Sequence, residues 1–240
     1  MILIRKLALV VSIVFGGSLA LAAAVVASGG GGLGPGSYTF TNKEAAATFG
    51  TLKGGPPSQQ AFNVIVDRGL NSFRPKGPKS ARTVVNSTIV NLAIFDDAGN
   101  TTFGCFMINP ADFSISKDLQ AAKLHTTLTA DEVCPGFGSP VTGSNAVTPL
   151  AISGAGLPLP ITLDIAWTGL GVTSTGTDRS TTQCLDYSTQ FNSTYKSSNA
   201  NASGTISAVA GSMATTQAGV TSSDVKATIK GTPQPACFPQ

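Results

Sequence analysis

Charged residues are scarce in this 240-residue chain, since Asp, Glu, Lys and Arg together make up only 11% of it. A typical globular domain has about 25% charged residues. Long surface helices need charged side chains on their wet face, so this composition excludes them as the main architecture. Ser and Thr supply the polar surface instead, with 24 Ser and 28 Thr in the chain. Hydroxyl-bearing and β-branched side chains favour strands.

Histidine and the usual hydrolase motifs are also scarce. His125 is the only histidine, and no G-x-S-x-G sequence occurs. A hydrolase triad needs a histidine that a buried carboxylate orients beside a nucleophile. Apolar Leu124 and Leu128 occupy one face of the strand predicted here, which places His125 on the other face, toward water. No catalytic residue is therefore assigned.

The first 27 residues have the three-part plan of a secretory signal peptide. Arg5 and Lys6 precede an uncharged apolar run from Leu7 to Ala27, and small residues near its end offer cleavage sites. We therefore expect residues 1–27 to be removed and the mature protein to be secreted or associated with the cell surface. Because about 20 apolar residues can also span a bilayer, the alternative is a retained membrane anchor over residues 7–27.

The mature chain has almost no net charge. Without Arg5 and Lys6, 13 basic residues face 12 acidic ones, so the net charge falls from +3 to near +1. No global field attracts such a protein to nucleic acid, and no nucleic-acid partner is expected.

Four cysteines, Cys105, Cys134, Cys184 and Cys237, lie in the part of the chain expected outside the cell. An even number in an oxidising compartment predicts two disulfides, for which three pairings exist. We favour Cys105–Cys134 with Cys184–Cys237, because each half of the chain then closes on itself. Zinc is disfavoured, since the cysteine spacings are too long and only one histidine exists. No metal or cofactor is expected.

Alternating apolar residues predict strands along most of the chain. Thr83 to Phe95 and Thr101 to Ile108 flank a Gly-containing turn and form a predicted hairpin, and residues 161–168 alternate cleanly. Only residues 44–49 and 118–123 resemble short helices. The predicted fold is therefore all-β, antiparallel and sandwich-like.

Residues 28–36 form a predicted Gly-rich flexible spacer, and residues 135–160 form an uncharged linker rich in Pro, Gly and Ser. The linker divides a first β-rich domain, 37–134, from a second, 161–240. Each domain could fold as a small sandwich-like half with one disulfide, or both could contribute strands to one fold. The first arrangement is the one we favour.

The four cysteines, together with the Trp167-Thr168-Gly169 motif that ends the alternating run, resemble a set of bacterial secreted β-rich proteins described only as hypothetical. The resemblance covers roughly Thr83 to Cys237. It implies an exported bacterial β-protein with the disulfide pairing above, and it implies no activity.

The strongest local charge feature is the segment from Arg68 to Arg82. Its five basic residues are Arg68, Arg74, Lys76, Lys79 and Arg82, with no acid among them. Pro75, Gly77 and Pro78 are expected to keep the segment out of a regular helix or a central strand. Two interpretations stay open for it. It is either a solvated loop that keeps a low-charge protein soluble, which we favour for the segment itself, or an exposed arm for the phosphate, sulfate or carboxylate groups of cell-wall polymers, other anionic extracellular polymers or lipid headgroups.

Two further features have structural interpretations. Asp96 and Asp97 fit a hairpin turn better than a calcium site, because the segment supplies too few alternating oxygen ligands. Trp167 continues the apolar face of its strand, which favours a core position over a sugar-stacking platform.

The sequence therefore predicts an exported, non-enzymatic binding or structural module of the cell surface or extracellular space. The alternatives are a secreted hydrolase acting on polysaccharides or esters, and a secreted inhibitor or effector that targets another protein.

Overall fold

The strands of the protein form one antiparallel sheet. The computed structural model describes residues 34–51, 61–77, 81–95, 101–132, 134, 159–207 and 213–232. The strands are β1 (Gly36–Thr51), β2 (Ala61–Pro75), β3 (Thr83–Phe95), β4 (Thr101–Ile108), β5 (Phe113–Ile115), β6 (Ala121–Leu128), β7 (Ile161–Cys184), β8 (Tyr187–Ile206) and β9 (Met213–Lys230), with 3-10 helices η1 (Pro110–Asp112) and η2 (Ala130–Glu132). Their order in the sheet is β4-β3-β2-β1-β9-β8-β7-β6-β5.

Several strands are much longer than the sequence pattern indicates, and β7 reaches 24 residues. Residues 44–49, which resemble a helix, lie inside β1. Residues 118–120 lie in a turn, and residues 121–123 are the first three of β6. Both helix predictions are wrong. The Ala-rich run of β1 pairs with β2 on one side and β9 on the other, so sheet pairing and burial override its local helix preference.

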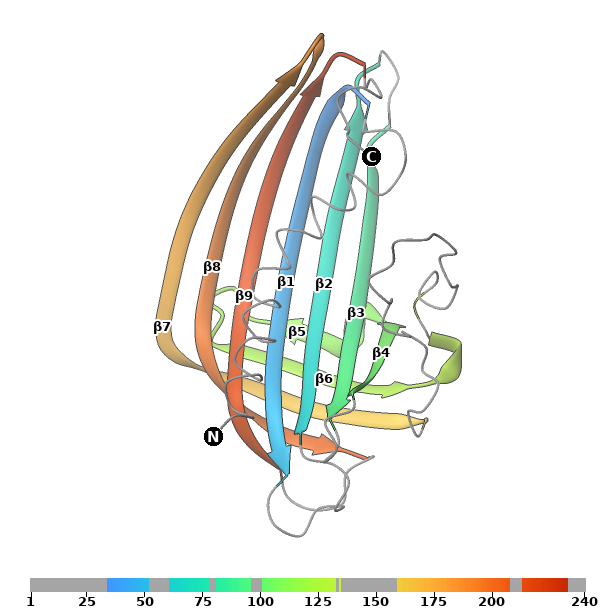
Figure 1. Ribbon diagram of the computed structural model, residues 1–240, viewed down its shortest axis with the longest axis vertical. Coiled ribbons are helices and arrows are strands. Elements are labelled where there is room, and N and C mark those ends of the chain that lie inside the picture. Colours follow the sequence, from blue (N-terminus) through green and yellow to red (C-terminus); the bar gives the residue numbers. More distant parts are fainter. Residues whose placement is uncertain are drawn as a thin grey trace.

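The sheet bends back over itself near one end of its long strands. The pairing of β7 with β8 shifts register between Gly169 and Thr173, and Gly171 has a φ of 77°. A Cβ atom on Gly169 would lie 2.8 Å from the Cα atom of Gln120, a backbone contact too short for any other residue, so the close approach requires glycine there. The first part of β7 then crosses the long strands together with β5 and β6 (Figure 1). We call this two-layered part the closed half, and the single-layered remainder the open half.

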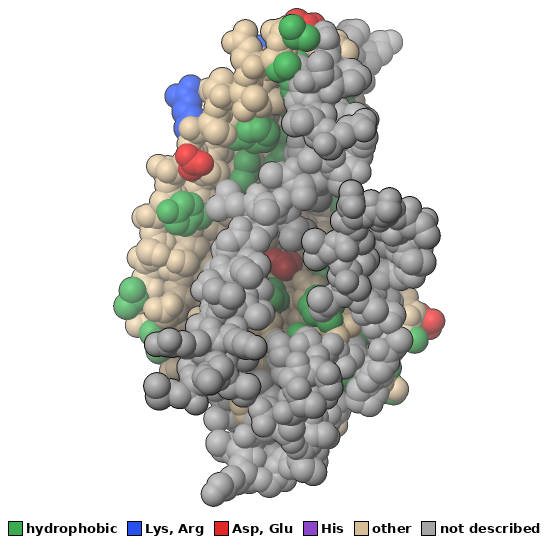
Figure 2. All heavy atoms as spheres, in the orientation of Figure 1, with side chains coloured by type: hydrophobic (Ala, Val, Ile, Leu, Met, Phe, Trp, Pro, Cys, Tyr) green, Lys and Arg blue, Asp and Glu red, His purple; other side chains and the backbone are tan. Residues whose placement is uncertain are grey.

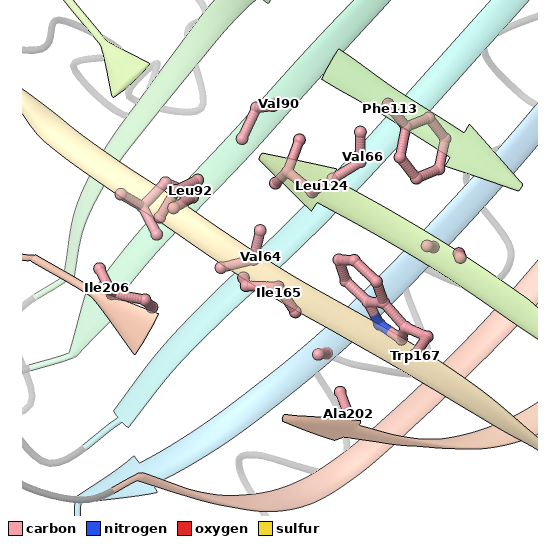
Figure 3. Close-up of a cluster of buried hydrophobic side chains, with 14 of the residues drawn as sticks. Val64, Val66, Val90, Leu92, Phe113, Leu124, Ile165, Trp167, Ala202 and Ile206 are labelled. Carbon is pink, nitrogen blue, oxygen red and sulfur yellow. The ribbon is translucent and has the colours of Figure 1, made fainter. Parts of the chain in front are cut away.

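The main hydrophobic core fills the space between the two layers of the closed half. Trp167 of β7 is only 1% exposed, and its Nε1 donates a hydrogen bond to the Ala46 carbonyl oxygen at 3.0 Å. Figure 3 shows Trp167 and Leu124 together with Val64 and Val66 of β2 in this cluster. The predicted core position of Trp167 is confirmed.

The long strands have two distinct faces. Directly opposed residues of paired strands share a face, and successive residues alternate between faces. The face that encloses the core in the closed half continues into the open half as the concave face, and the other is the convex face. A second apolar cluster lies on the convex face and comprises Tyr38, Phe40, Tyr187, Val225, Ala227 and Ile229, with Phe73 and Phe191 packed against it.

One disulfide joins Cys105 of the edge strand β4 to Cys134, which follows β6 and η2. The Cα atoms are 5.4 Å apart, and the Cys134 N–H donates to the Cys105 carbonyl oxygen at 2.9 Å. This predicted pairing is confirmed. Cys237 lies outside the described residues, so its pairing with Cys184 stays a prediction.

The predicted all-β antiparallel class is confirmed, whereas two separate sandwich-like halves are not seen. Strands from 37–134 and from 161–240 share one sheet, because β1 pairs with both β2 and β9. Residues 1–33, Asp96 and Asp97, and residues 135–158 lie outside the described part of the chain, so the turn predicted at Asp96 and Asp97 stays a prediction. Within that part, no helix has both the length and the apolar character that crossing a membrane would require.

Trp167→Phe should lower the free energy of unfolding by about 2 kcal/mol, because it shrinks a buried side chain and removes the hydrogen bond from Nε1 to the Ala46 carbonyl oxygen. Urea unfolding followed by far-UV circular dichroism measures the change. Tyr195→Phe, at a side chain that is 44% exposed, serves as the control and should shift stability by less than about 0.5 kcal/mol. Equal losses in the two variants would contradict the role assigned to Trp167.

Candidate functional site

Basic side chains are concentrated on one surface of the protein. The described residues include eleven Lys and Arg, of which eight lie on the concave face of the open half. These eight are Lys43, Arg68, Arg74, Arg82, Arg179, Lys196, Lys226 and Lys230. Asp224 is the one acidic residue among the described residues of that surface. We call this surface the basic face.

The strand register places these residues on the concave side. Lys43 lies two residues from Ala45, whose side chain is in the main core, so both have the same orientation along β1. Arg68 is directly opposite Lys43 on β2. On the other side of β1, Lys226 of β9 is opposite Thr39. Strands distant in sequence therefore contribute cations to a surface that no single sequence segment contains.

The basic face is extended rather than a pocket. Arg74 lies six residues beyond Arg68 along β2, which at about 3.3 Å per residue is a separation of about 20 Å. Lys43 and Arg68 are half-buried, and the other six cations are exposed. Such a surface fits a ligand with several anionic groups spaced along its length.

Hydroxyl and amide side chains, together with the exposed apolar Leu70 and Val84, fill the space between the cations. Thr39, Thr41, Asn192 and Thr194 belong to this set, and the described residues of the basic face include no aromatic side chain. The aromatic residues of the open half lie on the convex side. Figure 2 shows hydrophobic side chains over the upper strands, with Lys and Arg only near the margin of that view.

Three of the five predicted site residues belong to the basic face. Arg68 and Arg74 come from β2, and Arg82 donates from Nε to Ser72 Oγ at 2.5 Å, which holds it over the same surface. Lys76 is exposed just beyond β2, where its N–H donates to the Pro35 carbonyl oxygen at 2.7 Å. Lys79 lies outside the described residues.

The predicted conformation of this segment needs a correction. Residues 68–75 belong to β2, a central strand between β1 and β3, and are not an exposed loop. Pro75 is the last residue of that strand, where a missing N–H donor interrupts little of the pairing. The proline therefore ends the strand without excluding the residues before it.

Sequence reasoning missed the other five cations, which are Lys43, Arg179, Lys196, Lys226 and Lys230. Each is isolated from the Arg68–Arg82 segment, so no local charge cluster marks it. The alternation of Asp224, Lys226 and Lys230 along one strand indicates a shared charged face. Only the pairing of β9 with β1 and β8 places that face beside Arg68.

His125 lies on the outer surface of β6, as predicted. Its Nδ1 atom is 3.8 Å from Oδ2 of Asp164, and the two side chains are 78% and 67% exposed. A catalytic carboxylate that orients a histidine is normally buried, so this pair lacks the environment of a triad. Within the described residues, no group of three or more His, Cys, Asp or Glu side chains could hold a metal ion.

A pair of carboxyl groups lies on the opposite face of the sheet. Glu44 of β1 and Asp67 of β2 are directly opposed, and Glu44 is buried. Burial raises the pKa of Asp67, while hydrogen bonds from Asn42 and Glu44 act in the other direction. The Asn42 bond runs from Nδ2 to Oδ1 at 3.1 Å. Burial is the larger effect, so the Asp67 carboxyl keeps its proton to a higher pH than an exposed aspartate does, because its pKa is raised.

Comparisons with known proteins identify no family for this chain. Neither the known family models nor the curated proteins contain a match. A solved acetoacetate decarboxylase-like enzyme from Sphingomonas wittichii RW1 overlaps 84% of this chain and 93% of its own, at 8% identity and a TM-score of 0.29. A TM-score this low does not indicate a shared fold.

Asp67→Asn should stabilise the protein at neutral pH, on the order of 1 kcal/mol, and have little effect in acid. A raised pKa in the folded state means that the stability associated with protonated Asp67 is present at low pH and lost as the pH rises through the folded-state pKa. Urea unfolding between pH 4 and pH 8 tests this expectation.

Asp118→Asn provides a control of opposite sign. Hydrogen bonds from Ser116 and Gln120 lower the pKa of the exposed Asp118 carboxyl, so its contribution is lost as the pH falls. If the free energy of unfolding depended on pH near neutrality in the same way in Asp67→Asn and in the wild type, the predicted effect of the raised pKa of Asp67 would be wrong.

Proposed function

We propose that this protein is an exported, non-enzymatic binding module that holds an anionic extracellular or cell-wall polymer on its basic face. The supporting observation is the segregation of charge, with eight of eleven described cations on one surface beside a single acid. Carboxylate, sulfate or phosphate groups along an extended chain are the ligand chemistry that this surface suits.

Charge segregation also argues against the alternative of a solvated loop. Side chains that only maintain solubility are expected to be interspersed with acids over the whole surface. Here Lys117 and Lys123 are the described cations outside the open half, and they lie around β6. The net charge of the mature chain near +1 therefore conceals a strongly positive surface.

The composition of the basic face narrows the ligand class. Neutral glycans and single-stranded nucleic acids are commonly held by stacking on aromatic rings. The described residues of the basic face have cations, hydroxyls and amides but no such ring. Binding should therefore depend on charge and weaken as salt is added.

Export is part of the proposal and rests on two features. The apolar run over residues 7–27 has the plan of a signal peptide. The Cys105–Cys134 disulfide suits an oxidising compartment. For the hydrolase and the inhibitor alternatives, the described residues offer no comparable arrangement.

A double charge reversal tests the proposed function. Arg179→Glu with Lys226→Glu should weaken binding of the secreted protein to polygalacturonate by about tenfold or more at low salt, because both exposed cations lie on the basic face. Sedimentation or isothermal titration calorimetry at low and high salt measures the change, with neutral dextran as the reference polymer.

Lys117→Glu with Lys123→Glu is the matched control, since it changes the net charge equally on a different surface. That variant should retain most of the wild-type affinity. Equal weakening by both double variants would mean that net charge, and not the basic face, determines binding. Polyphosphate and dextran sulfate in parallel identify the preferred anionic group.

We also propose that Cys184 pairs with Cys237. Cys184 is disulfide-bonded, and Cys105 and Cys134 bond each other, which leaves Cys237 as the remaining cysteine of the chain. Mass spectrometry of a non-reduced digest should find a peptide that links residues 184 and 237 and disappears on reduction. A free Cys237 thiol would disprove the pairing.

A further inference from the structure

The inner end of the basic face is a single row of residues across the sheet. Each residue of the row is directly opposite the next on the neighbouring strand. From β3 to β7 the row reads Thr88, Arg68, Lys43, Ser222, Lys196 and Thr175. Three of its six members are cations, and Arg68 and Lys43 are immediate neighbours.

The contact between Arg68 and Lys43 has no compensating acid. Like charges directly opposite each other destabilise a sheet, and both side chains are half-buried, where water screens them less. Within the described residues, neither makes an ion pair with a carboxylate. Asp224 instead accepts a hydrogen bond from Thr41, and Asp112 accepts one from Thr126.

Thr88 adds an unused polar group directly opposite Arg68, with Lys43 on the other side of that arginine. The side chain is 1% exposed, and its Oγ1 atom has no hydrogen-bond partner. Buried hydroxyls are nearly always hydrogen-bonded, so this one calls for an explanation. A donor hydroxyl in one row with two cations is a combination that recognises an oxyanion.

The row also marks the point where the basic face ends. The next inward-facing row contains Val90, Val66 and Ala45, all in the main core. Arg68 reaches the second layer there, since its Nη1 donates to the Phe113 carbonyl oxygen of β5 at a long 3.5 Å. So weak a bond leaves the guanidinium able to turn aside, which would give an anion access to Thr88.

We propose that Thr88, Arg68 and Lys43 form a discrete site for one oxyanion, a phosphate, sulfate or carboxylate group, at the inner end of the basic face. The inference rests on the proposed function in one respect, because the terminal anionic group of a bound polymer is one source of that oxyanion. Free inorganic phosphate is the other source with the same chemistry.

Thr88→Val is the decisive variant, because it removes the hydroxyl and preserves the shape of the side chain. Isothermal titration of the full secreted protein with inorganic phosphate should show binding that this variant weakens about tenfold or more, as expected for one lost hydrogen bond to a charged group. Thr175→Val, at the exposed far end of the same row, is the matched control and should bind phosphate as the wild type does.

Lys43→Gln gives a second measurement that does not depend on substitution in the core. It should weaken phosphate binding at least as much as Thr88→Val, while thermal unfolding checks that both variants remain folded. Failure of the wild-type protein to bind millimolar phosphate would overturn the site, and so would equal phosphate binding by Lys43→Gln and the wild type.

Oligogalacturonates of increasing length distinguish the two sources of the anion. If a short oligomer competes with phosphate, and this competition is lost in Thr88→Val, the site binds the end of a polymer. If phosphate binds and the oligomer does not compete with it, the site binds the free ion. The Arg179→Glu and Lys226→Glu pair should weaken phosphate binding much less than Lys43→Gln does, because both residues lie outside the row. If phosphate binds but that pair does not affect polygalacturonate binding, the proposed function fails and the oxyanion site stands.

Discussion

The unbroken register between β1 and β2 is the constraint on which the rest of the structure depends. It runs from Gly36 opposite Pro75 to Gly50 opposite Ala61 without a shift. Because side chains alternate strictly along a strand, the same register that buries Ala45 and Ala47 places Lys43 on the concave side. A slip of one residue would exchange the two faces and turn Glu44 toward the core side in place of Ala45. Hydrophobic burial in the closed half therefore fixes the position of charge in the open half.

The strands that the sequence predicts best contribute to the closed half. Residues 83–95, 101–108 and 161–168 alternate clearly, because one side of each faces the core and the other faces water. The pattern fails for residues 44–49, where both sides of the strand are buried and small alanines dominate. It also fails along the second part of β7, residues 173–184, where nearly every side chain is exposed and polar. Hydrophobic alternation marks a strand only where one face is buried and the other is exposed. In these segments the two faces differ little in burial.

The candidate site illustrates a different limit. Arg68, Arg74 and Arg82 are close in the chain, so their charge cluster is visible in the sequence alone. Their partners on β9 and β8 are some 150 residues away and reach them only through the pairing of β1 with β9. Periodicity gives the face of each residue within its own strand, but it does not say which strands are neighbours. The nearly neutral net charge of the chain also gives no sign of the basic face, because gathering the cations on one surface does not change the total charge.

The Cys105–Cys134 bridge has a consequence for the solution behaviour of the molecule. An open sheet has two free edges, and exposed edge strands can template pairing with another chain. The bridge and the hydrogen bond from Cys134 to Cys105 fasten edge strand β4 to the chain that follows β6, next to the last strand at the opposite edge. One covalent bond thereby closes an array of strands that hydrogen bonds otherwise hold together. Reduction would remove that closure and leave β4 held by its pairing with β3 and by the burial of Phe106 and Ile108.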